Sequence, residues 1–274
     1  MRTLTSFFFL LTGLVLSWPD ALLAEGPAPP AVDIRNEEWR FDIFTDNQKV
    51  GHMYLRAMVV RDIVILKTEF AAPFKGQDAG FDTEITYRGT DKPVPVRGKA
   101  TTRLGGFKLM DGSVTFTVMG AGEAETLMAK TEVLGYADKD RKPFAQAMPA
   151  NREAAAPNGL VLSYPAFLFF APRLLPKPGQ VDKVVYMGLP ADIDFPDFLN
   201  FQTGCVLSRG MLTDDGRSEF ALKRIYPGGN AVVVAALTID RDGKIVESRM
   251  GRFTLRPESP EPPKTPGAKP VGGK

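Results

Sequence analysis

The chain has 274 residues, of which 44% are hydrophobic and 24% are charged, and its formal net charge is only +2. This balance argues against a dedicated nucleic-acid-binding protein, which needs a surplus of Lys and Arg. One cysteine (Cys205) and one histidine (His52) exclude an internal disulfide, a Cys-rich metal cage and a multi-histidine metal site.

The first 24 residues have the order of a signal peptide. Arg2 precedes an apolar run that continues to Leu16, and small or apolar residues at 21–24 stand before Glu25. The apolar core of about ten residues is shorter than the roughly 20 that a membrane-spanning helix needs, so no stable transmembrane anchor is expected. We expect residues 1–24 to direct export to the periplasm or the medium. An uncleaved anchor is the alternative, because Leu22 is a mediocre residue at the −3 position.

The exported chain divides into three parts. Residues 25–32 are Pro-rich and predict a short, semi-stiff linker. Residues 257–274 hold six prolines, three glycines and no aromatic residue, which predicts a disordered tail because such a segment buries little apolar surface. Residues 33–256 remain as one domain, long enough for a single core.

Alternating apolar and polar residues recur through this domain and are typical of β-strands. Trp39, Phe41 and Ile43 alternate with Arg40 and Asp42. Further strands are expected at residues 50–55, 63–66, 81–87, 114–118, 181–187, 220–226, 231–239 and 245–255. Turn clusters separate several of them, at residues 46–48, 61–62, 214–216, 228–230 and 240–243. The pattern predicts a mainly β fold, with an antiparallel curved sheet closed into a barrel or left as a half-barrel.

Helix is scarce in the sequence. Residues 151–156 have helix-friendly composition but end at Pro157. Residues 165–171 begin with Pro165, which suits a first helical turn, and are expected to end before Pro172. Residues 195–201 are another candidate for a short turn of helix. One or two short helices are therefore expected over the sheet.

Two segments resemble ligand-binding motifs but lack a residue that the motif requires, and a third is a cluster of carboxylates. Residues 119–125 look like a dinucleotide-binding turn, but Glu125 stands where the third glycine is needed, so we predict a glycine-rich connection. Residues 240–243 look like part of a calcium loop, but Arg249 would occupy the position of the bidentate glutamate, so we predict a hairpin turn. Asp192, Asp194 and Asp197 form an acidic cluster, for which a solvated loop is the favoured interpretation and metal binding by the carboxylates is the alternative. No metal site and no cofactor are predicted.

The sequence assigns no catalytic residue. His52 and Cys205 could act as base and nucleophile only if the fold brought them together, and neither a Gly-x-Ser-x-Gly elbow nor a His-Glu-x-x-His helix occurs. Paired carboxylates for glycoside hydrolysis are recognised only by their separation in space, so a carboxylate-dependent hydrolase stays open as a third-ranked hypothesis.

The strongest unusual feature is a concentration of aromatic residues between positions 164 and 201, punctuated by Pro165 and Pro172. A buried core is one interpretation. The functional interpretation is a cover over a curved sheet that lines a cavity for a lipid or another hydrophobic molecule. The candidate ligand-binding side chains are Tyr164, Phe167, Phe169, Phe170, Phe195, Phe198 and Phe201.

Three segments together resemble a known group of proteins. Residues 39–51 combine an aromatic-rich strand with a polar turn and Lys49-Val50-Gly51. Residues 162–179 give a short apolar helix followed by a Pro-Gly, and residues 237–246 give a strand, an Asp-x-Asp-Gly turn and a strand. This order resembles exported bacterial β-rich proteins of unknown function with a lipoprotein-carrier-like (LolA/LolB-type) half-barrel. The resemblance implies a noncatalytic envelope protein that holds a hydrophobic molecule.

The sequence therefore predicts an exported protein that binds rather than catalyses, with a lipid or other hydrophobic ligand in the concavity of its sheet. The alternative is a structural or protein-interaction module of the cell envelope, in which the Pro-rich tail binds a protein partner or acts as a tether.

Overall fold

The computed structural model describes residues 36–74, 76–119, 126–136, 143–144, 151–154, 160–187 and 201–258. The predicted signal peptide at 1–24 and linker at 25–32 lie outside the described residues. The predicted tail does so beyond Glu258, whose amide donates a 2.9 Å hydrogen bond to the carbonyl of Arg40.

The described elements are sixteen strands and one helix. The first half of the chain forms β1 (Glu37–Thr45), β2 (Gln48–Val60), β3 (Ile63–Phe74), β4 (Gln77–Arg88), β5 (Val94–Leu104), β6 (Phe107–Met119), β7 (Thr126–Tyr136) and β8 (Pro143–Phe144). The second half forms β9 (Asn151–Ala154), β10 (Val161–Ser163), α1 (Tyr164–Leu174), β11 (Val181–Met187), β12 (Phe201–Arg209), β13 (Ser218–Ile225), β14 (Ala231–Ile239), β15 (Ile245–Met250) and β16 (Phe253–Pro257).

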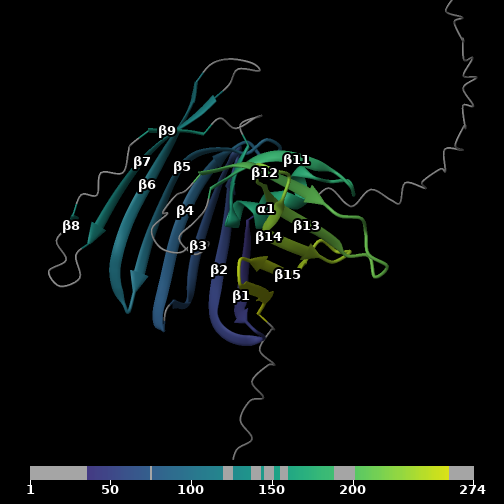
Figure 1. Cartoon of the computed structure of the whole chain (residues 1–274), viewed down its shortest axis with the longest axis horizontal. Coiled ribbons are helices and arrows are strands. Elements are labelled where there is room, and N and C mark those ends of the chain that lie inside the picture. The colour runs from purple at the N-terminus through teal and green to yellow at the C-terminus, as the bar shows by residue number, and fades with distance from the viewer. Residues whose placement is uncertain are drawn as a thin grey trace, which may run out of the picture.

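All the described strands belong to one curved sheet, which confirms the mainly β prediction. The strand order is β10-β11-β12-β13-β14-β15-β16-β1-β2-β3-β4-β5-β6-β7-β8, and β9 pairs with β7. Neighbours are antiparallel except β10 and β11, which are parallel. Among the described strands none joins β10 to β8, so the sheet is open; the half-barrel prediction is confirmed and full closure is wrong (Figure 1).

The first and last strands of the domain meet in the middle of the sheet. β1 pairs with β16 through Phe41–Pro257 and Ile43–Leu255, so residues from both ends of the described chain share one hydrogen-bonded ladder. Figure 1 shows β1–β7 on one side of the molecule and β11–β15 on the other, with α1 between them. The two halves therefore form a single unit around one core.

Local sequence explains the hairpins. Asp46 and Asn47, with φ of 51° and 63°, form the turn between β1 and β2. Two successive residues with positive φ form a type I′ turn, whose twist matches that of the paired strands. Asp and Asn tolerate this conformation better than most residues. Arg61, with φ of 57°, lies in the predicted turn between β2 and β3, and Gly216, Gly228, Gly229 and Gly243 supply positive φ in the remaining predicted turns. The turn predictions are therefore confirmed.

Two helix predictions need correction. Residues 151–154 form β9, which pairs with β7 from Leu127 to Lys130, because a helix cut off at Pro157 is too short to be stable while an unpaired strand edge offers backbone partners. The other helix, α1, continues past Pro172 to Leu174, since its buried surroundings compensate for the missing proline amide. Residues 195–200 of the third candidate lie outside the described residues, and Phe201 begins β12.

Candidate functional site

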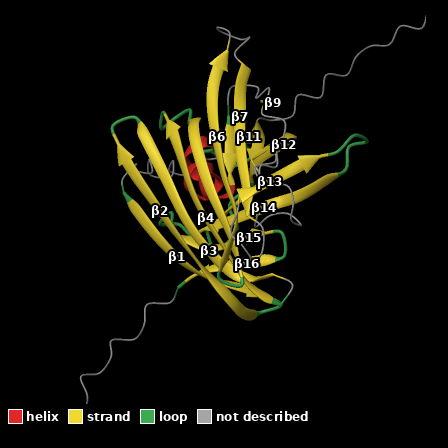
Figure 2. Cartoon of the chain, turned by 90° about the vertical axis from the view of Figure 1, so that its left-hand side faces the viewer, coloured by secondary structure: helices red, strands yellow, loops and turns green. Residues whose placement is uncertain are grey.

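The helix α1 occupies the concavity of the sheet. It lies against β3 from one side of the molecule, β13 from the other, and β10, which precedes it directly. Figure 2 shows it behind the strands labelled β2 and β4. All eight residues from Tyr164 to Ala171 are buried, so the helix is apolar around its whole circumference and forms the centre of the core.

The structure brings together four of the seven candidate ligand-binding residues. Tyr164, Phe167, Phe169 and Phe170 all lie on α1 and are buried. Phe170 packs edge-on against Tyr87 with ring centroids 5.2 Å apart, and Phe169 does so against Trp39 at 6.0 Å. These rings act as core side chains in this conformation, and ligand binding by them stays a prediction.

The side chains of the other three candidates lie outside the part of the chain that the structure describes. Phe195 and Phe198 lie outside the described residues, and Phe201 is described only as the first residue of β12.

Hydrogen bonds fix the beginning of α1. Ser163 caps the helix, because its Oγ accepts from the amide of Ala166 at 3.4 Å. Its own amide donates to the hydroxyl oxygen of Tyr87 at 3.4 Å. Tyr87 is fully buried, and this burial raises the pKa of its phenol to about 12. The phenol is therefore neutral at physiological pH and links β4 to the start of the helix.

A buried arginine fixes the segment that follows α1. Arg209, on β12, is only 5% exposed, and its guanidinium donates to the carbonyls of Leu175 (3.1 Å) and Pro176 and to Oγ of Ser218 (2.8 Å). Burial lowers the pKa of this guanidinium. It also lies over the ring of Phe220, with Cζ 5.2 Å from the centroid. The contacts hold the chain leaving α1 against β12 and β13.

Small side chains cross the inner face of the sheet beside α1. Thr68 on β3 lies opposite Thr83 on β4, which lies opposite Ala100 on β5, which lies opposite Gly112 on β6. We call these four residues the small-residue row. All four are buried. The flanking rows hold larger apolar residues, such as Leu66 and Ile85.

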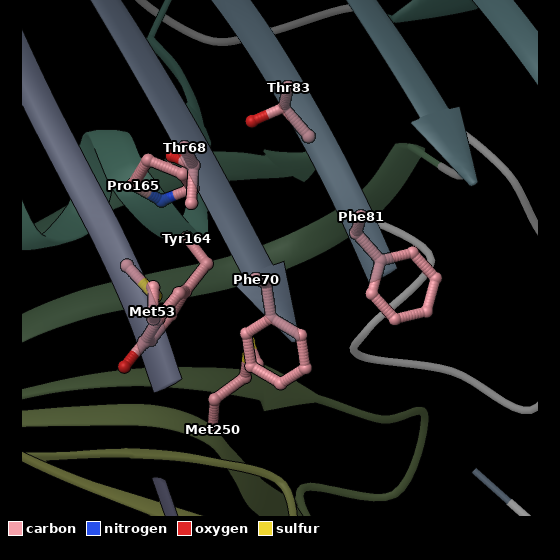
Figure 3. Close-up of a pocket in the computed structure, with 8 residues that line it drawn as sticks. All are labelled: Met53, Thr68, Phe70, Phe81, Thr83, Tyr164, Pro165 and Met250. Atoms are coloured by element: carbon pink, nitrogen blue, oxygen red, sulfur yellow. The ribbon is translucent and has the colours of Figure 1, made fainter. Parts of the chain in front are cut away.

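A small pocket lies at the Thr68 end of this row (Figure 3). Its lining comes from β2, β3, β4, the first turn of α1 and β15, and comprises Met53, Thr68, Phe70, Phe81, Thr83, Tyr164, Pro165 and Met250. Its volume is about 20 Å³, which is enough for one water molecule. In this conformation the pocket is much too small for a lipid.

Two polar atoms of the residues that line the pocket are buried behind its apolar surface and have no hydrogen-bond partner within the described part of the chain. They are the Oγ1 atoms of Thr68 and Thr83, on side chains that are 5% and 6% exposed. A buried hydroxyl without a partner costs roughly 1–3 kcal/mol. Sequence reasoning missed both residues, because only the pairing of β3 with β4 places them opposite each other.

The structure separates the two residues of the hypothetical catalytic dyad. His52 is exposed on β2, whereas Cys205 is buried on β12, and five strands lie between them in the sheet. Burial raises the pKa of the Cys205 thiol, which disfavours the reactive thiolate. These two residues therefore form no base–nucleophile pair.

The other chemical motifs have structural roles or lie outside the described part. In the turn at 240–243, one carboxylate oxygen of Asp240 accepts from the amides of Asp242 and Lys244, both at 2.9 Å, so it stabilises a hairpin as predicted. After β6 ends at Met119, the next described element is the strand β7 and not a helix. Asp192, Asp194 and Asp197 lie outside the described residues. No group of three or more His, Cys, Asp or Glu within the described ranges is placed to hold a metal.

Comparisons with known proteins give little guidance. No family model matches the chain, and no curated protein matches it. A solved structure of a DUF1089 family protein from Pseudomonas aeruginosa shares 11% identity, with coverage of 88% of this chain and 95% of that chain and a TM-score of 0.37. A similarity at this level supports no inference about function. The resemblance to lipoprotein carriers stays a prediction. No described helix is long and apolar enough to span a membrane.

Proposed function

We propose that the protein is an exported, noncatalytic binder of a hydrophobic molecule such as a lipid, held between α1 and the inner face of the sheet. The observation that carries the proposal is the pocket at the small-residue row. It lies on the apolar inner face of an open sheet, at the point where the first turn of α1 meets β3 and β4. Small side chains leave room near a sheet surface that larger ones would fill.

Binding at this place requires α1 to shift away from the sheet, because the pocket holds only one water-sized volume. Such a shift would break the hydrogen bonds of Ser163 with Tyr87 and of Tyr164 with Ser248, whereas the ladders that join β2, β3, β4 and β5 would stay intact. The proposed ligand would extend from the pocket along the small-residue row and would be shielded from water there. An apolar molecule gains roughly 25 cal/mol for each Å² of apolar surface that it buries.

Native mass spectrometry and lipid extraction of the purified protein test this proposal. We expect a co-purifying hydrophobic molecule that is lost when the row is filled by Ala100→Leu. Thr115→Leu is the matched control, because Thr115 is exposed on the outer face of the neighbouring strand β6. Circular dichroism establishes that both variants are folded, and Ala100→Val provides a smaller change if the leucine variant is not.

The absence of any extracted ligand, together with no binding of added lipid, would contradict the proposal. It would favour the alternative of an envelope scaffold. Export is tested separately by fractionating cells that express the full chain and by sequencing the amino terminus of the exported protein. We expect it to begin near Glu25.

A further inference from the structure

The hydroxyls of Thr68 and Thr83 are poorly explained by packing alone. Both residues lie on central strands and line the pocket, and Figure 3 shows the hydroxyl of Thr83 pointing toward Thr68. Valine has nearly the same shape and would suit a buried strand position without leaving a polar atom unpaired. Two buried hydroxyls on directly paired residues, with no partner among the described residues, therefore indicate a site for a hydrogen-bonding group from outside the protein once α1 shifts and uncovers them.

The surrounding charges restrict the chemistry of that group. Seven of the eight lining residues carry no titratable group, and the eighth, Tyr164, donates its hydroxyl proton to Ser248 at 2.8 Å. A phosphate or carboxylate in this pocket would lose its hydration without meeting a cation. A neutral acceptor loses far less, and an ester or amide carbonyl can accept from both threonine hydroxyls at once.

We infer that Thr68 and Thr83 bind the ester or amide carbonyl of a neutral acyl lipid, whose hydrocarbon chain follows the small-residue row. This inference rests on the proposed function and adds to it the chemical class of the ligand.

The test compares two probes of equal chain length, methyl palmitate and hexadecane, by competition against a bound fluorescent fatty acyl ester. Wild-type protein is expected to bind the ester at least tenfold more tightly than the alkane. The double variant Thr68→Val/Thr83→Val is expected to lose this preference through weaker ester binding, with alkane binding unchanged. Tenfold corresponds to 1.4 kcal/mol, about the net value of one hydrogen bond.

Thr86→Val is the matched control. Thr86 is buried and also has an Oγ1 atom without a partner among the described residues, but it is paired with Ile65 and Arg97 and points to the opposite face of β4. This variant should keep the ester preference. If wild type and the double variant discriminate equally, the threonine hydroxyls take no part in ligand binding and the inference fails while the proposed function stands. If wild type binds neither probe, both fail.

A second, independent observation concerns the hairpin between β13 and β14. Ile225, Tyr226, Val232 and Val233 are all exposed, the two valines by 53% and 52%. Successive residues from Ala231 to Val233 are exposed, so both faces of this strand end stand clear of the core. Lys223 and Arg224 lie beside the apolar tip, opposite Val233 and Val232.

We propose that this hairpin inserts its tip into a membrane surface that contains anionic lipid. Residues 220–239 contain two basic residues and no acidic residue, which gives the tip a positive charge. The Arg224 guanidinium lies 4.8 Å from the ring centroid of Tyr226, so an amphipathic ring and a cation lie together next to the exposed valines. This combination suits the boundary between headgroups and acyl chains.

Co-sedimentation with vesicles of phosphatidylcholine containing 30% phosphatidylglycerol tests the hairpin proposal. We expect binding that weakens with salt and falls at least tenfold in Val232→Glu. Val60→Glu, at an exposed valine of the β2–β3 hairpin, is the control and should bind as wild type does. Equal sedimentation of all three proteins, or none by wild type, overturns the proposal, as does a purified envelope protein that binds the hairpin when vesicles do not.

Discussion

The hydroxyl of Tyr164, the first residue of α1, donates a 2.8 Å hydrogen bond to Oγ of Ser248 on β15, a residue 84 positions away in the sequence. Ser248 in turn donates to the carbonyl of Ala236 on β14 at 2.7 Å. Both side chains are buried. This relay holds the helix start to the strands opposite β3 and thereby defines one side of the pocket.

Removal of the phenolic hydroxyl in Tyr164→Phe is expected to lower the free energy of unfolding by about 1–3 kcal/mol, because it leaves a buried hydrogen-bonding group of Ser248 without its partner. Ser248→Ala should cost a similar amount. The double variant should cost less than the sum of the two, and chemical denaturation of all four proteins measures this coupling. Additive effects would contradict a direct contribution of the hydrogen bond.

Many strands and turns of this fold were predictable because their signals are local, although β5, β7 and β12 were not predicted and the single strand expected at 245–255 is two strands, β15 and β16. Phe41 and Ile43 are buried, as their alternation with Arg40 and Asp42 predicts. The turn at Asp46 and Asn47 has the positive φ angles that those residue types favour. Each signal lies within a few neighbouring residues, so it can be recognised without knowledge of the rest of the chain.

The features that define the site depend on contacts between distant segments. The pairing of β1 with β16 and the row from Thr68 to Gly112 follow from strand order and register, which local alternation does not encode. The aromatic concentration at Tyr164–Phe170 was visible in the sequence. The complete burial of these residues depends on the two sides of the sheet curving around α1. The sequence alone did not distinguish a buried core from the lining of a cavity.

A methyl group at Gly51 is expected to destabilise the protein by roughly 3 kcal/mol or more, because Cβ would lie 2.0 Å from the carbonyl oxygen of Ala71 on the paired strand β3. Neither backbone can yield without breaking ladder hydrogen bonds. Gly210→Ala is the control, since its nearest neighbour atom would be 3.6 Å away. Thermal unfolding of the two variants provides the measurement, and a Gly51→Ala protein as stable as the control would show that β2 and β3 are not this close.

The buried guanidinium of Arg209 should not be replaceable by an ammonium. Arg209→Lys is expected to cost about 2–4 kcal/mol, because a lysine at this position cannot reach Ser218 and the two carbonyls that follow α1 with the same planar group. Urea denaturation measures the loss. Arg217→Lys serves as the control, since Arg217 is exposed and its ion pair with Asp215 contributes little. An equal effect of the two substitutions would contradict the role assigned to Arg209.

The phenol of Tyr87 should make the protein less stable at alkaline pH. Its pKa is about 12 in the folded protein and 10.0 for an ordinary tyrosine. Between these values the unfolded chain loses the proton while the folded chain keeps it, so the free energy of unfolding falls as pH rises from 10 toward 12. The contribution of this residue over that interval is on the order of 1–3 kcal/mol.

Tyr87→Phe should therefore be slightly less stable at pH 7, where it loses the contacts with Ser163, but its stability should decline less steeply above pH 10. Urea unfolding at several pH values measures the free energy of unfolding of both proteins. Taking the difference between the two values cancels the contribution of lysines and other tyrosines, which titrate in both proteins. Parallel curves above pH 10 would show that Tyr87 ionises in the folded state as freely as in the unfolded chain.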